Sequence, residues 1–323
     1  MNAPQESLTT LAQLLKGTGD PLRLEILRAL RTDSFGVLEL CDIFAVKQPA
    51  MSHHLKVLAN AGAVTTRREG NSIFYRRALA DQTEPSGQLL AALFVAVDQL
   101  ALEVQTAANI TRIKHEREEL AREFFDRHAD QFREQQELIA PFDQYVEAVT
   151  DLLLQTEPEK RQRALEIGPG EGAYLPTLAD VFGEVIAIDI SSEMLEKAET
   201  LIRQGKLNNV KLLKADTEDA VEQQIRVERV VCNMVLHHVP SPADVFADCA
   251  QLLEPGGALI VTDLCRHDQD WTKKMCGDLW QGFDPEELTS WAIDAGLESK
   301  ESLYLGLRNG FQIQIRRFDK PEQ

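Results

Sequence analysis

Apolar residues recur at helical spacing in the first part of the chain. Asp20-Pro21 places a capping carboxylate before proline, the arrangement that starts many helices. Gln48-Pro49 predicts a second start, and Gly62 predicts the end of that helix. The apolar residues that repeat behind the first start are Leu22, Ile26, Leu27 and Leu30.

Two short strand-like runs follow, at 63–68 and 72–77, on either side of Glu69-Gly70-Asn71. Glycine and asparagine between two such runs are typical of a hairpin turn. We therefore expect residues 8–80 to form several short helices that end in a β-hairpin.

The remainder of the chain changes its periodicity once. From 88 to 150 the pattern is helical, with one expected interruption at Pro141, and a charged linker covers 156–163. Helical stretches then alternate with apolar runs, which predicts a parallel sheet covered by helices on both faces. These runs are 164–167, 185–188, 210–213, 230–233 and 258–262. Two closely spaced final runs, 297–305 and 311–318, predict an antiparallel pair.

Length and charge point to separate domains. A chain of 323 residues is typical of two domains. Residues 1–80 hold ten Lys and Arg against seven Asp and Glu, a net of +3, whereas 81–323 hold 24 against 45, a net of −21. Only the first part has the charge expected of a module that meets a polyanion. We expect a DNA-binding domain at 1–110, a helical linker and lid at 111–160, and a ligand-binding domain at 161–323.

The sequence disfavours a membrane protein and a protein stabilised by disulfide bonds. The longest uncharged apolar run, 89–97, is shorter than the roughly 20 residues of a membrane-spanning helix. The first residues show no basic start followed by an apolar stretch, so we expect no secretory signal, no membrane partner and a cytoplasmic location. Five cysteines without paired spacing fit a reducing compartment.

The helix expected after Pro49 has two different faces. Met51, Leu55 and Leu58 share one side and predict packing against the earlier helices. Short or cationic side chains occupy the other side, as on a helix that enters the major groove of DNA. Arginines on both strands of the hairpin suit phosphate contacts, although ordinary solvated charges would give the same pattern. The expected DNA-binding residues are Gln48, Ser52, His53, Lys56, Arg67 and Arg68, with Asn60, Arg76 and Arg77 beside them.

These segments resemble the ArsR family of winged-helix repressors. The resemblance rests on the runs 19–27, 51–58 and 68–71, and covers roughly residues 8–110. It implies a homodimer formed by the first and last helices, here 8–17 and 88–112, that reads a pseudo-palindromic double-stranded operator. Many relatives sense metals through a Cys-x-Cys pair, where this chain has only Cys41. One thiolate does not make a closed metal site, so we expect no metal there and a small buried side chain instead.

A glycine loop marks the start of the second domain. The run 166–172, with glycines at 168, 170 and 172, follows a strand-like segment and precedes a helix. With Ala173 it also satisfies a dinucleotide-binding pattern, and Asp189 stands where an acid accepts ribose hydroxyls. A nucleoside ligand is expected on either interpretation.

Three features favour S-adenosylmethionine over NAD. Glu166 suits an ammonium-bearing tail better than a pyrophosphate, and Asp216 can accept from an adenine amino group unless it only caps a loop. The runs 233–239 and 253–257 complete a set that resembles class I S-adenosylmethionine-dependent methyltransferases over about residues 120–318. The resemblance implies an α/β Rossmann-like domain with a mostly parallel seven-stranded sheet. Its expected cofactor-binding residues are Glu166, Gly168, Gly170, Gly172, Asp189, Ile190, Met194, Asp216, Thr217 and Asn233.

Catalytic candidates are few. His237 and His238 flank the expected methyl-acceptor cleft, one of them as a packing or capping residue, and 124–129 resembles the lid of small-molecule methyltransferases. Cys265, His267 and Cys276 form at most a partial metal site, with packing the favoured interpretation. Arsenite methylation is disfavoured because every cysteine of this domain follows the glycine loop.

The joining of the two modules carries the functional hypothesis. A DNA reader joined to a nucleoside-binding domain is expected to be a ligand-responsive transcriptional regulator, most simply a repressor. The resemblance includes regulators of the methionine cycle that respond to S-adenosylhomocysteine. An active small-molecule methyltransferase with its own DNA-binding module, and a metalloid-responsive regulator, remain the alternatives, because the fold alone does not establish activity.

Overall fold

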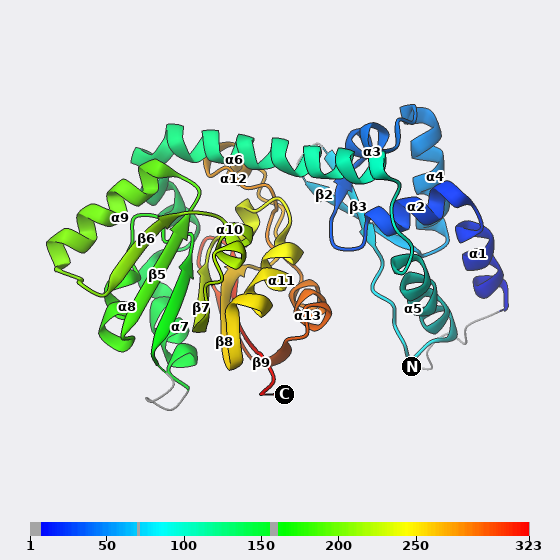
Figure 1. The fold of residues 1–323 in the computed structure, drawn as a ribbon. Helices are drawn as coiled ribbons and strands as arrows, with labels where there is room; N and C mark the ends of the chain where they lie inside the picture. The colour runs from blue at the N-terminus through cyan, green and yellow to red at the C-terminus, as the bar shows by residue number, and fades with distance from the viewer. Residues whose placement is uncertain (1–7, 70–71, 156–160, 323) are drawn as a thin grey trace. The chain divides into compact units, whose positions relative to one another are not determined.

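The computed structural model describes residues 8–69, 72–155 and 161–322 (Figure 1). The chain divides into two compact units, Met1–Arg117 and Glu118–Gln323. The boundary falls within the long helix α6 (Val104–Ile139), beyond residue 110. The segment 111–160 is therefore shared between the two units and does not form a body of its own.

The first unit is mostly helical with a small sheet. Its strands run in the order β1-β3-β2, and β2 and β3 form the expected antiparallel hairpin. The added strand β1 pairs with β3 and was not predicted, because two residues are too short for a periodic pattern. The elements ahead of α6 are α1 (Leu8–Thr18), α2 (Pro21–Ala29), β1 (Phe35–Gly36), α3 (Val37–Phe44), α4 (Gln48–Asn60), β2 (Val64–Glu69), β3 (Ser72–Arg77) and α5 (Pro85–Asp98).

Local signals set the helices of this unit as predicted. Asp20 caps α2, and its carboxylate accepts a hydrogen bond of 3.1 Å from the backbone N–H of Arg23. Pro49 lies in the first turn of α4. The apolar faces of α2 and α4 meet in one core that contains Ile26, Leu27, Leu30, Met51, Leu55 and Leu58.

The prediction of one helical stretch from 88 with a single interruption at Pro141 was wrong. α5 ends at Asp98, and α6 begins only at Val104. The Asp98 carboxylate accepts two hydrogen bonds from Arg77, and the carbonyl of Leu100 accepts one from Arg28. These partners come from distant parts of the sequence, so the helix end is fixed by tertiary contacts that local periodicity does not encode.

The second unit contains the predicted seven-stranded sheet. Its order is β6-β5-β4-β7-β8-β10-β9; the first five strands are parallel, and the pairs β8-β10 and β10-β9 are antiparallel. The strands are β4 (Arg163–Ile167), β5 (Glu184–Asp189), β6 (Val210–Lys214), β7 (Val227–Asn233), β8 (Leu253–Leu264), β9 (Glu298–Gly306) and β10 (Gln312–Asp319).

Helices follow most of the parallel strands and pack on the sheet (Figure 1). They are α7 (Val146–Leu153), α8 (Leu175–Val181), α9 (Ser192–Gly205), α10 (Thr217–Glu222), α11 (Pro242–Leu252), α12 (Trp271–Met275) and α13 (Pro285–Asp294), with short turns η1 (Phe142–Gln144) and η3 (Leu236–His238). The chain builds outward from β4 in one direction and from β7 in the other. The carboxyl ends of β4 and β7 therefore form a topological switch point, where open α/β sheets bind ligands.

Among the described residues, no helix is long and apolar enough to cross a membrane.

Candidate functional site

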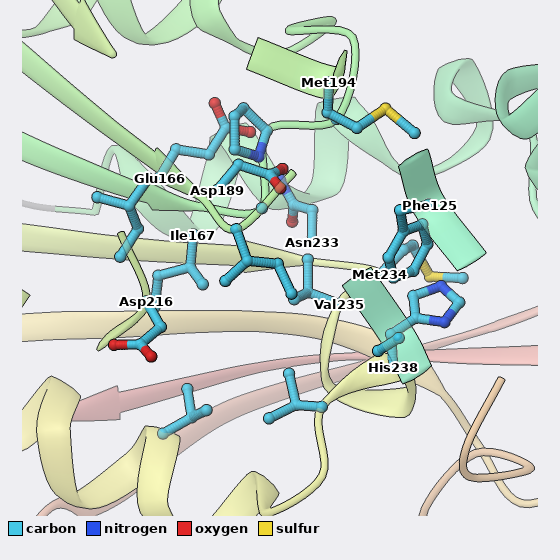
Figure 2. Close-up of a pocket in the computed structure, with 18 of the residues that line it drawn as sticks. Phe125, Glu166, Ile167, Asp189, Met194, Asp216, Asn233, Met234, Val235 and His238 are labelled. Atoms are coloured by element: carbon cyan, nitrogen blue, oxygen red, sulfur yellow. The ribbon is translucent and has the colours of Figure 1, made fainter. Parts of the chain in front are cut away.

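A cavity of about 340 Å³ lies at the switch point of the second unit. Residues from the ends of β4, β5 and β7 line it, together with the start of α10 and the last part of α6 (Figure 2). Among the predicted cofactor-binding residues, all except Gly172 line this cavity. The fold thus brings together segments that the sequence could only place in order.

The glycine loop needs glycine for two different reasons. Gly168 has a φ of +62°, and a Cβ there would lie 2.6 Å from Cγ2 of Val235. Gly172 has a φ of +85°, and its Cβ would lie 3.3 Å from Cα of Ala198 on α9. Gly168 therefore allows the loop to pack against Val235, whereas Gly172 allows it to approach α9 closely.

Two carboxyl groups, from Glu166 and Asp189, face the cavity from adjacent strands (Figure 2). Burial, together with the smaller effect of the nearby Asp189, raises the pKa of Glu166 to about 8. Burial also raises the pKa of Asp189 to about 6, although backbone N–H groups of Ser191, Gly170 and Ile190 oppose that rise. A cation in the cavity would favour the charged forms of both groups.

Buried polar atoms of the cavity lack partners. Oε2 of Glu166 and both side-chain polar atoms of Asn233 are buried without a hydrogen-bond partner among the described residues. Since a buried unpaired polar atom costs about 1–3 kcal/mol, such atoms in a cavity point to a ligand that satisfies them. The amino-acid tail of an adenosyl ligand, with its ammonium and carboxylate groups, has the donors and acceptors that these atoms require.

Asp216 and Thr217 reach the cavity wall with their side chains already engaged. Asp216 caps α10, where its carboxylate accepts a 2.8 Å hydrogen bond from the Asp219 N–H, and it remains exposed. The hydroxyl of Thr217 donates to Asp248 at 2.6 Å. Asp216 thus combines the two roles that the sequence left open, a cap and a cavity-lining acid, while Thr217 positions Asp248.

The two histidines of η3 occupy different environments. His238 lines the cavity, and burial holds its pKa well below the usual value. His237 lies behind it, where Nδ1 is 2.9 Å from Oδ1 of Asp263. Burial opposes the charged form, yet Asp263 and Asp278 raise the pKa of His237 to about 9. The pair therefore separates into one neutral cavity residue and one internal cation.

The predicted lid segment contacts the cavity through α6. Phe125 packs edge-on against His238 at a centroid distance of 5.0 Å and also contacts Met194. Asp126 accepts a 2.8 Å hydrogen bond from the hydroxyl of Ser191. Figure 2 shows Phe125 and His238 side by side at one end of the cavity. Sequence reasoning missed Met234, a cavity residue held at a φ of +55°.

Helix α4 of the first unit presents the polar face expected for DNA. Met51, Leu55 and Leu58 are fully buried. All the other residues named for this face are exposed; they are Gln48, Ser52, His53, Lys56 and Asn60. The division of the helix into a packed side and an open side follows the sequence prediction, and DNA contact by the open side stays a prediction.

The hairpin arginines divide into different roles. Arg68 is exposed, but the side chain of Arg67 is only 4% exposed and pairs with the buried Glu69. Arg67 is therefore a correction to the predicted DNA-contacting set, because neighbouring residues of a strand face opposite sides. Arg77 is also structural, with bonds of 2.9 and 2.6 Å to Asp98 and one of 2.6 Å to the carbonyl of Leu27.

The cysteines do not form a ligand set. Cys232 and Cys249 are fully buried in β7 and α11, as predicted, and burial raises the pKa of the Cys265 thiol to about 11. Cys41 is partly buried, and the group of potential metal ligands found among the described residues contains no cysteine. Cys265, His267 and Cys276, for which packing was the favoured interpretation, do not belong to that group.

Exposed apolar side chains occur on the helices expected to dimerise. Leu8 and Leu15 lie on α1, Val95 lies on α5, and Leu100 and Val104 lie at the junction of α5 and α6. Large exposed apolar side chains are typical of surfaces that bind another protein. The homodimer remains a prediction.

Comparison with protein families places both modules. Residues 20–66 match the family of bacterial regulatory proteins described as the arsR family. Residues 165–261 match a methyltransferase domain. The two matches follow the order that the sequence analysis predicted.

Individual relatives resemble a part of the chain. A ubiquinone biosynthesis O-methyltransferase of Thiobacillus denitrificans is 30% identical over 158 residues, which are 45% of this chain and 68% of that protein. A ubiquinone biosynthesis O-methyltransferase of Proteus mirabilis is 27% identical over 157 residues, which are 45% of this chain and 64% of that protein. The chain therefore spans less than two thirds of the length of that relative.

A solved structure supports the fold. The Haemonchus contortus phospholethanolamine N-methyltransferase 2, in complex with phosphomonomethylethanolamine and S-adenosylhomocysteine, aligns with a TM-score of 0.53 and 16% identity. The alignment covers 62% of this chain and 60% of that one.

Arg68, which is exposed, and Arg77, which is bonded to Asp98, give a matched test of the two roles that hairpin arginines have. We expect Arg68→Ala to weaken binding to DNA of any sequence and to lower the salt slope by about one unit, with a smaller loss of stability than Arg77→Ala. Arg77→Ala should instead lower the free energy of unfolding by about 2 kcal/mol, because it removes charged hydrogen bonds to Asp98. Urea unfolding and DNA titration at several salt concentrations measure both. Unchanged stability of Arg77→Ala would contradict the structural role.

The raised pKa of Glu166 predicts proton release on binding of an adenosyl amino acid. The empty site holds a mostly protonated Glu166 at pH 7, since its pKa is about 8. An ammonium group lowers that pKa, so affinity should rise with pH below 8, by up to about tenfold per unit. Calorimetry in two buffers of different ionisation enthalpy should detect close to one released proton at pH 7. The release should vanish in Glu166→Gln; its persistence there would assign the proton to another group.

Proposed function

Because the chain belongs to the methyltransferase family that includes the ubiquinone biosynthesis O-methyltransferases, and carries an ArsR-family regulatory domain ahead of it, we propose that it is a transcriptional repressor with an adenosyl effector. In this proposal the first unit binds double-stranded operator DNA as a homodimer. The second unit binds S-adenosylmethionine or S-adenosylhomocysteine. The proposed targets are genes for enzymes of the methionine cycle, because those enzymes produce and consume these ligands.

The observation that carries the proposal is the set of unpartnered polar atoms in the cavity. Glu166 and Asn233 supply them at the ends of β4 and β7, and Asp189 adds a carboxylate at the end of β5. Glu166 and Asn233 would hold the amino-acid tail, and Asp189 would accept the ribose hydroxyls. Asp216 would lie toward the adenine. When bound, S-adenosylmethionine supplies an activated methyl group; the residues of this chain bind and orient it.

The open face of α4 supports the DNA-binding half. Ser52 and His53 are the proposed base-reading residues, because they carry donors on the exposed first turns of the helix. Lys56 and Arg68 are the proposed phosphate contacts. Gln48, at the start of the helix, would add a further polar contact.

An active small-molecule methyltransferase is the second candidate. The cavity continues past the proposed adenosyl subsite to Phe125 and His238, where an acceptor would lie. His238 has a lowered pKa, so it is neutral at pH 7 and able to take a proton. On this alternative the DNA-binding unit would place the enzyme at its own promoter. A metalloid-responsive regulator has less support, because the group of potential metal ligands found among the described residues contains no cysteine.

The regulator proposal predicts coupling between ligand and operator. Operator affinity at fixed salt is measured with S-adenosylmethionine, with S-adenosylhomocysteine and with no ligand. We expect the ligands to change affinity by roughly 5- to 150-fold, the usual range of allosteric coupling. The two ligands should differ, because only one carries the sulfonium charge and the methyl group. Three superimposable curves at saturating ligand would leave the enzyme as the better account.

Asp189 gives a test of ligand binding alone. Ligand at about 100 times its dissociation constant stabilises a protein by roughly 2.7 kcal/mol. We expect Asp189→Ala to fold and to lose this stabilisation in a melting experiment. Glu184→Ala is the matched control, because Glu184 begins the same strand and pairs with Arg163 and Lys211 at the surface. Equal ligand stabilisation in both variants would remove Asp189 from the site.

A further inference from the structure

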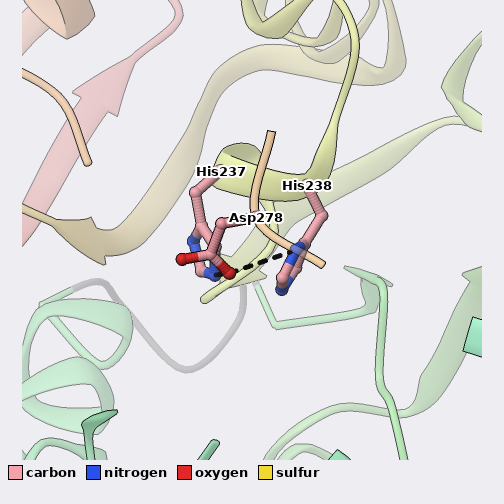
Figure 3. A group of neighbouring side chains, drawn as sticks. All are labelled: His237, His238 and Asp278. Atoms are coloured by element: carbon pink, nitrogen blue, oxygen red, sulfur yellow. Dashed lines mark ion pairs between the residues drawn. The ribbon is translucent and has the colours of Figure 1, made fainter. Parts of the chain in front are cut away.

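The structure gathers two imidazoles and a carboxylate behind the adenosyl cavity. One ligand-type atom from each of His237, His238 and Asp278 lies within 4.8 Å of the others, and all three residues are buried (Figure 3). Oδ1 of Asp278 is 3.8 Å from Nε2 of His237 and 3.7 Å from Nδ1 of His238. From this arrangement we propose a second site in this domain, one that binds a divalent first-row transition ion through two histidines and one aspartate.

The distances suit a small ion. Zinc bonds of about 2.0–2.1 Å in a tetrahedral site place neighbouring ligand atoms about 3.3 Å apart. The two separations that involve Asp278 exceed this by about 0.5 Å or less, which side-chain rotation supplies. Two nitrogens and one carboxylate oxygen, without thiolate, are a set used for zinc, cobalt and ferrous iron.

The buried carboxylate of Asp278 is the group in the cluster that a cation would stabilise most. Both oxygens of that carboxylate are buried. The groups that face them are the imidazole of His237 and the hydroxyl of Thr272, which also lies 3.3 Å from the carbonyl of Gln269. Since an uncompensated buried carboxylate is costly, the position requires a proton, an imidazolium or a metal ion.

A further carboxylate orients the nearer histidine. Oδ1 of Asp263 lies 2.9 Å from Nδ1 of His237 and accepts the N–H of Leu264 at 2.7 Å. When Nδ1 of His237 donates its proton to Asp263, the other ring nitrogen, Nε2, is directed toward Asp278. Most metal-binding histidines have such a carboxylate or carbonyl partner, and its loss typically lowers metal affinity 10- to 100-fold.

The backbone holds the cluster in place before any ion binds. The N–H groups of Leu279 and Trp280 both donate to the carbonyl of His237, at 2.9 and 3.0 Å. They fix the loop that carries Asp278 to the turn that carries the histidines. His238 belongs to the cluster and also lines the adenosyl cavity, so the ion and the adenosyl ligand would share one side chain.

Two carboxylates lie beside the imidazole of His237, Asp263 at Nδ1 and Asp278 at Nε2. A divalent ion bound by His237, His238 and Asp278 would place two positive charges beside these carboxylates and balance both.

Cobalt titration of the full chain tests the site. Tag-free protein stripped with a chelator is titrated with Co²⁺ while visible absorption is followed, and Zn²⁺ is then added as competitor. We expect one Co²⁺ per chain, displaced by Zn²⁺. Asp278→Asn should lower the affinity at least 10-fold, and Asp263→Asn should lower it about 10- to 100-fold. His267→Gln should bind as the wild type does, because His267 lies outside the cluster.

The wild-type protein provides a second readout that depends on no variant. The stoichiometry of Co²⁺ bound to the unmodified chain should be one, and an equimolar amount of Zn²⁺ should displace it. Absence of saturable Co²⁺ binding, or equal binding in Asp278→Asn, would overturn the proposal and leave a buried ion pair. None of these measurements requires DNA binding or methyl transfer, so failure here leaves the proposed function untouched.

Discussion

The second unit depends on two carboxyl groups being held where water is excluded. The parallel pairing of β4 and β5 places Glu166 and Asp189 on neighbouring strands, at the edge where the chain changes direction across the sheet. Burial makes the charged forms of both groups unfavourable, and the charge of Asp189 adds to this effect at Glu166. The folded domain carries this cost because the surrounding sheet is extensively packed, and a cationic ligand relieves it. Without a ligand, the two carboxyl groups therefore lower the stability of the domain. A bound cationic ligand removes that loss and so stabilises the fold.

Local patterns predicted most of the framework. Proline in the first helical turn, the glycine loop and the alternation of apolar runs each act over a few residues, and they gave α2, α4 and the seven-stranded sheet correctly. Failures occurred where distant residues decide the outcome. The break between α5 and α6 depends on Arg77 and Arg28, which are remote from it in sequence. The third strand of the small sheet is too short to have a period.

The site shows the same division. Asp189 and the glycines could be assigned because each lies beside the strand that positions it. Asp278 could not, because only the folded loop between α12 and α13 brings it to His237. Arg67 is a different kind of miss. Strand alternation alone required Arg67 and Arg68 to face opposite sides, and the apolar pattern around them is too weak to show which one turns inward.

The burial of the thiols has a consequence for how the molecule meets oxidants and alkylating reagents. The thiolate is the reactive form of cysteine, and burial raises the pKa of Cys232, Cys249, Cys265 and Cys276. The native fold therefore protects these four sulfur atoms from peroxide, and mild oxidation should leave the second unit unchanged. Conversely, any opening of the sheet or of the helices around it exposes reactive sulfur. Modification of these cysteines would then report local unfolding rather than redox sensing.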